Sequence, residues 1–81
     1  MQEREFLAAT RLQRLDAVRR SGEYLGSRAY GSHRVHLYAM NGFYCEVWIR
    51  WGTDQVEWIE VARNTDILSE HVKSDVKGLF H

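Results

Sequence analysis

The chain has 81 residues, of which 44% are hydrophobic and 27% charged, and its formal net charge is zero. A chain of this length forms one domain, residues 1–81, and its composition is that of an ordinary globular protein and not of a disordered one. The single cysteine, Cys45, excludes a stabilising disulfide, and no Cys/His cluster indicates a metal, so we predict no cofactor. Because so small a core is marginal, association with a second copy is the remaining common remedy.

The charged N-terminus has no apolar run behind it, and no stretch approaches the roughly 18 apolar residues of a membrane span. An unpaired cysteine fits a reducing compartment, so we expect a cytoplasmic protein without membrane contact. Residues 1–50 hold eight basic and five acidic side chains, whereas residues 51–81 hold three basic and six acidic ones. This asymmetry fits a basic helix beside an acidic helix in one monomer, or charge-matched association between copies.

The first predicted element is a helix from about residue 2 to residue 20, because Ala, Leu, Arg, Glu and Gln dominate this stretch. Its apolar stripe recurs at helical spacing and contains Ala8, Leu12, Leu15 and Val18. Ser21-Gly22 is the first stop signal and Gly26 a second, so the end of the helix stays open. Residues 26–32 are predicted as a connection, with a short strand at 28–30 as an open alternative.

Residues 33–61 predict a three-stranded antiparallel meander. On one face, strand one places Val35, Leu37 and Ala39, and strand two places Phe43, Cys45, Val47, Ile49 and Trp51. A three-residue loop, 40–42, aligns these apolar sets with Leu37 opposite Cys45. A two-residue Asn41-Gly42 turn would instead pair Leu37 with Glu46 and mix the faces. We therefore predict the three-residue loop.

The second hairpin turns through residues 52–55. We predict that Ile59 and Val61 join the core face, whereas a loop of even length would send Trp58 inward. A second helix follows over about residues 64–79, with Asn64 or Thr65 as its N-cap and Gly78 as its stop signal. The predicted fold is therefore an α+β two-layer sandwich, helix–meander–helix, with both helices on one face of the sheet.

The outer face of this predicted sheet is too aromatic for a surface that meets only water. Its members are Arg34, His36, Tyr38, Tyr44, Glu46, Trp48, Arg50, Trp58 and Glu60. Tyr, Trp and Arg are typical of interface hot spots, and the mixed charges are self-complementary. We predict a protein-interaction module that forms a homodimer, or binds another protein, through this face. The alternative is an ordinary solvent-exposed sheet.

Catalysis has one candidate pair, His36 and Glu46, which the predicted register places opposite each other. No nucleophile or oxyanion loop accompanies the pair, so we predict that the protein is not an enzyme. Cys45 lies on the predicted core face, where a thiol is inert. His33 and His36 point to opposite faces of their strand, so they do not form a metal site.

Nucleic-acid binding is the second hypothesis, because a sheet rich in Trp, Tyr and Arg can stack bases. The chain lacks the basic excess that phosphate binding requires. The predicted element order resembles that of the double-stranded RNA-binding domain. The last predicted helix opens Asn64-Thr65-Asp66-Ile67 and the first hairpin loop is Met40-Asn41-Gly42, so that family's basic residues are missing. The resemblance therefore carries over no functional residue.

Overall fold

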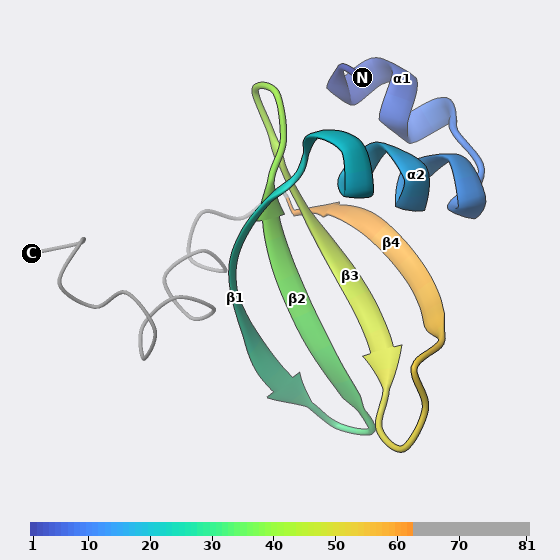
Figure 1. Ribbon diagram of the computed structural model, residues 1–81, viewed down its shortest axis with the longest axis vertical. Helices are drawn as coiled ribbons and strands as arrows, with labels where there is room; N and C mark the ends of the chain where they lie inside the picture. The colour runs from blue at the N-terminus through green and yellow to red at the C-terminus, as the bar shows by residue number, and fades with distance from the viewer. Residues whose placement is uncertain (63–81) are drawn as a thin grey trace, which may run out of the picture.

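A computed structural model describes residues 1–62, which form two helices and one four-stranded antiparallel sheet (Figure 1). The elements are α1 (Glu3–Ala8), α2 (Arg11–Ser21), β1 (Glu23–Tyr30), β2 (His33–Ala39), β3 (Tyr44–Arg50) and β4 (Val56–Ala62). The strands follow one another in the order β1-β2-β3-β4. The α+β class is confirmed, but the sheet has a fourth strand, and the predicted helix 64–79 lies outside the described residues. The element order therefore differs from the helix–three strands–helix order of the double-stranded RNA-binding domain.

The predicted N-terminal helix is two helices. The backbone of Ala9 is extended, and Thr10 begins α2 with a capping box. The Thr10 hydroxyl accepts from the Gln13 N–H at 3.2 Å, and the Gln13 side chain accepts from the Thr10 N–H at 2.9 Å. Leu12 is 72% exposed and so does not belong to the buried side of α2, which contains Ala17 and Val18. α2 ends at Ser21, so the first of the two stop signals ends the helix.

β1 occupies a stretch that we predicted mostly as a connection. It pairs with β2 from Glu23 opposite Ala39 to Tyr30 opposite His33, with a bulge at Leu25. A two-residue turn, Gly31-Ser32, joins the strands, and Gly31 has φ +58°, a conformation that glycine adopts without strain. The open alternative of a strand at 28–30 is therefore realised, over a longer range.

The β2–β3 hairpin has the register that we rejected. Leu37 lies opposite Glu46, and the Met40 N–H donates to the Phe43 carbonyl at 2.7 Å, which closes a two-residue Asn41-Gly42 turn. The predicted three-residue loop is therefore wrong. Its premise was that all apolar residues share one face. In the structure both faces carry buried apolar side chains, because Leu37 lies on the face opposite Cys45 and both are fully buried.

The β3–β4 hairpin agrees with the prediction for its inner residues. Ile59 lies opposite Val47 and Val61 opposite Cys45, which leaves Trp58 and Glu60 on the other face. We did not predict the bulge between Val56 and Trp58, where Glu57 is the additional residue. As a result the Glu57 side chain joins the end of the sheet near the turn between β3 and β4.

The helices cover one face of the sheet, which we call the helix face; the opposite one is the far face. The core on the helix face consists of Phe6, Val18, Phe43, Cys45, Val47 and Ile59. Phe6 and Phe43 meet edge to face, with ring centroids 5.2 Å apart. Both helices contact β4, which places them at that side of the sheet (Figure 1).

Arg14 of α2 fastens the two helices to the sheet. Its Nε donates to the Phe6 carbonyl at 2.9 Å and its Nη2 to the Leu7 carbonyl at 3.0 Å. Its Nη1 donates to the Ile59 carbonyl on β4 at 2.6 Å. One guanidinium therefore satisfies carbonyl groups at the end of α1 and on the outer edge of β4.

Candidate functional site

The far face carries a group of aromatic and charged side chains that the strand pairings bring together. One row across the sheet contains Arg28, Val35, Trp48 and Trp58, and the next contains Tyr30, His33 and Arg50, with Glu57 of the bulge beside them. We call Arg28, Tyr30, His33, Trp48, Arg50, Glu57 and Trp58 the far-face cluster.

Trp48 is the centre of this cluster. Trp58 stacks on it at 4.8 Å between centroids with an interplanar angle of 21°, whereas Tyr30 and His33 each meet it edge to face at 5.6 Å. Trp48 itself is only 9% exposed, but Trp58 is 39% exposed and Tyr30 59% exposed. The cluster therefore has a buried centre and an aromatic rim that meets solvent.

Arg28 links the aromatic rings to a buried carboxylate. Its guanidinium lies 5.0 Å from the Tyr30 ring centroid and 5.9 Å from that of Trp48. Its Nη2 lies 3.4 Å from Oε2 of Glu46, a side chain that is almost fully buried. A planar guanidinium can serve both functions, because it stacks on rings with its face and donates with its edge.

Glu46 is an unusual residue for a sheet interior. It lies opposite Glu60 on β4, and burial raises the pKa of the Glu46 carboxyl. The nearby Arg28 opposes that rise, whereas Glu60 adds to it. The far face thus holds a carboxyl group whose ionised form is disfavoured by its surroundings.

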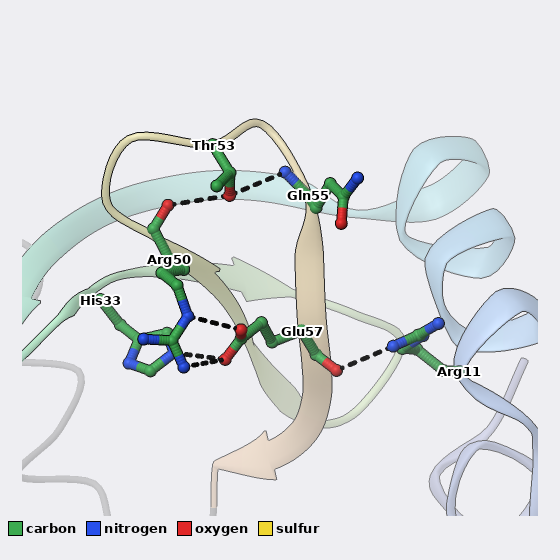
Figure 2. Close-up of polar contacts among 6 residues, drawn as sticks. All are labelled: Arg11, His33, Arg50, Thr53, Gln55 and Glu57. Carbon is green, nitrogen blue, oxygen red and sulfur yellow. Dashed lines mark hydrogen bonds and ion pairs between the residues drawn. The ribbon is translucent and has the colours of Figure 1, made fainter.

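Glu57 contacts His33, Arg50 and Arg11 at the end of the sheet, as Figure 2 shows. Its Oε2 accepts from Arg50 Nε at 2.7 Å, and its Oε1 lies 3.2 Å from Arg50 Nη2 and 2.6 Å from His33 Nε2. Its backbone carbonyl accepts from Arg11 at 3.2 Å. The contacts from Arg50 and His33 lower the pKa of Glu57 to about 2, so the carboxylate is ionised over the physiological range.

On the helix face, the part formed by β1 and β2 has a second, smaller polar group. The Tyr24 hydroxyl lies 3.3 Å from His36 Nδ1, and its ring meets Tyr38 edge to face at 5.4 Å. Arg34 lies 4.6 Å above the Trp51 ring and donates to the Ser27 hydroxyl at 2.9 Å. We placed Trp51 in the core, but it is 48% exposed.

The structure divides the predicted outer face between the two sides of the sheet. The far face holds Tyr44, Glu46, Trp48, Arg50, Trp58 and Glu60. The helix face holds the three members from β2, which are Arg34, His36 and Tyr38. The cause is the one-residue difference in the β2–β3 register, which moves every side chain of one strand to the other face.

The same difference separates the predicted catalytic pair. His36 lies opposite Val47, so His36 and Glu46 are on opposite faces and cannot exchange a proton. Cys45 agrees with its prediction, since it is fully buried in the core on the helix face. Burial raises the pKa of the Cys45 thiol to about 12 and keeps it protonated.

Within residues 1–62, no group of three or more His, Cys, Asp or Glu side chains is arranged to hold a metal ion. No helix in this part of the chain is both long and apolar enough to cross a membrane.

Four members of the far-face cluster were absent from the predicted set: Arg28, Tyr30, His33 and Glu57. Arg28 and Tyr30 lie on β1, most of which we predicted as a connection because glycines flank it. His33 was excluded only by the wrong register, because it shares a face with Val35 and Leu37. Glu57 depends on the bulge, for which the sequence carries no recognisable signal.

No protein-family model, curated protein or solved structure matches this sequence. The geometry of the described residues is therefore the basis for any assignment of function.

Proposed function

We propose that this chain is a small protein-interaction module that self-associates through the exposed rim of the far-face cluster. One observation carries the proposal: the solvent-exposed ring of Trp58 is stacked on the buried Trp48, with the exposed Tyr30 on the other side of Trp48. Rigid, partly buried aromatic side chains lose little conformational entropy when a partner covers them, which is why they dominate interface energetics.

The charges around the rim favour a second copy as the partner. Arg50 and Glu57 form an ion pair at the rim, and the exposed Glu60 lies on the same strand as Glu57. A two-fold axis brings a mixed-sign surface against itself, so that each arginine can face a carboxylate of the other copy. The neutral net charge means that no long-range repulsion opposes the encounter.

Binding rather than catalysis is the proposed task, because His33 and Glu57 bind each other and Glu57 also binds Arg50, which leaves these groups engaged in an ion-pair network. The protonated, buried thiol of Cys45 suits a reducing compartment, so we place the module in the cytoplasm.

The test is the solution mass of the protein as a function of concentration. Replacing Trp58 by Ala removes a central aromatic residue of the proposed interface, and truncation of such a residue costs about 2 kcal/mol, or roughly a 30-fold weaker dimer. The matched control is Trp51→Ala, which removes an exposed tryptophan on the other face. We expect the control to associate like the wild type. Equal dissociation constants for Trp58→Ala and the wild type would contradict the proposal.

A second candidate function is single-stranded nucleic-acid binding by the same rim. The exposed rings of Trp58 and Tyr30 lie in one cluster with two arginines, which is a pattern that stacks bases and contacts phosphates. The carboxylates of Glu57 and Glu60 disfavour it. Titration of labelled oligonucleotides at about 50 and 200 mM salt decides the question, because phosphate contacts make affinity fall steeply with salt.

A further inference from the structure

The two edges of the sheet differ. On β4 the outward carbonyls of Glu57 and Ile59 accept from Arg11 and Arg14 at 3.2 and 2.6 Å, so α2 occupies the groups that an added strand would need. The bulge at Glu57 also distorts this edge. Both devices are known ways of preventing an edge strand from pairing with another chain.

The β1 edge lacks these devices in its second half. Tyr30 and His33 flank a two-residue turn and therefore form a hydrogen-bonded pair, so by alternation Ser27 and Ala29 point their backbone groups away from β2. Within residues 1–62, no hydrogen bond reaches these outward N–H and C=O groups. β1 contains no proline and no lysine, and Ser27 and Ala29 are too small to shield the edge.

We propose that β1 pairs antiparallel with β1 of a second copy about a two-fold axis, which joins the two four-stranded sheets into one. The pairing uses the backbone N–H and C=O of Ala29, which lies at the axis, and it is a contact separate from the far-face rim proposed above. The helices make their largest contacts with β4, which forms the opposite edge of the sheet from β1 (Figure 1).

The side chains of β1 favour its own sequence as the partner strand. With Ala29 opposite the partner's Ala29, each Arg28 lies opposite the partner's Tyr30 on the far face. Arg28 already lies 5.0 Å from the ring centroid of its own Tyr30, so a second ring extends an existing cation–π contact. Antiparallel pairing also repeats this favourable contact on both sides of the axis, as an isologous interface requires.

Ala29→Pro tests the proposal with little expected cost to the monomer. Proline lacks the N–H that the second copy must accept, but this N–H points away from β2, so the ladder within the sheet stays complete. The matched control is Ala29→Val, which keeps the N–H and favours a strand. Both changes are made in a Trp58→Ala background, so that the far-face contact is weakened in every sample.

We expect the Trp58→Ala and Trp58→Ala/Ala29→Val proteins to dimerise at high micromolar concentration, and the Trp58→Ala/Ala29→Pro protein to dimerise at least about tenfold more weakly by sedimentation. Circular dichroism establishes that each variant keeps its sheet. Amide hydrogen exchange of the wild type gives a second readout, in which the Ala29 amide becomes protected as concentration rises.

Two results would overturn the edge contact: equal association of the Pro and Val variants, or an unprotected Ala29 amide in a concentrated sample. Neither result bears on the far-face proposal, which fails only if Trp58→Ala leaves the association of the wild type unchanged. If Ala29→Pro does not fold, the exchange measurement on the wild type alone decides.

Discussion

Two glutamates of the far face respond to their surroundings in opposite directions. Burial raises the pKa of Glu46, whereas the contacts from Arg50 and His33 lower the pKa of Glu57 to about 2. The folded protein therefore holds a proton on Glu46 more tightly than the unfolded chain does, and one on Glu57 less tightly. By linkage, Glu46 reduces the free energy of unfolding as pH rises through its folded and unfolded pKa values, and Glu57 increases it above its unfolded pKa.

Replacing each residue by glutamine should reveal these opposite signs. Relative to the wild type, Glu46→Gln should be more stable at about pH 7 than at about pH 3, because the disfavoured ionised form is gone. Glu57→Gln, its control, should be less stable at the higher pH, because the stabilising carboxylate is gone. Urea denaturation at both pH values measures this. A Glu46→Gln effect that is independent of pH would contradict the assigned burial of the carboxyl group.

At the scale of elements, the break between α1 and α2 depends on the capping box at Thr10. Removing its hydroxyl with Thr10→Ala leaves the Gln13 N–H without this acceptor and should cost about 1 kcal/mol of stability. Thr10→Ser keeps the hydroxyl and should cost much less. The midpoint of chemical denaturation measures both. Equal effects would mean that packing, and not the cap, starts the helix.

The helix and strand features that could be predicted are those with a local sequence pattern. The Ser21-Gly22 stop and the Trp58 and Glu60 side of β4 followed from local patterns. The capping box of Thr10 and Gln13 was also present in the sequence, but the continuous helical composition around it concealed the break. β1 was missed because Gly26 and Gly31 suggest a connection, and only pairing with β2 makes this stretch a strand.

The predicted interface was partly wrong because we assumed that only one face of the sheet is apolar. The β2–β3 register was chosen so that only one face would be apolar, but Val35 and Leu37 are fully buried on the far face. Five of the six far-face predictions (Glu46, Trp48, Arg50, Trp58 and Glu60) belong to the cluster or border it. The three from β2 lie on the helix face, because alternation of side chains transmits a register error along the whole strand.

For the whole molecule, association should contribute to stability, because a small chain buries little apolar surface by itself. The thermal unfolding midpoint of the wild type should therefore rise with protein concentration, as linkage between binding and folding requires. The Trp58→Ala/Ala29→Pro double variant, with both proposed contacts weakened, should have a midpoint that changes much less. Calorimetry over about a hundredfold range of concentration makes the comparison. A flat midpoint for the wild type would show that the monomer is stable without a partner.

The arginines of α2 have a consequence for how far sheet pairing can extend. A sheet with two open edges can add copies without limit and grow into a fibre, whereas a sheet with one open edge stops after a single addition. Because Arg11 and Arg14 occupy the outward carbonyls of β4, pairing through β1 ends with two copies. The two guanidinium groups thus leave each sheet with a single edge that can pair, and the proposed contact gives a closed dimer and not a fibre.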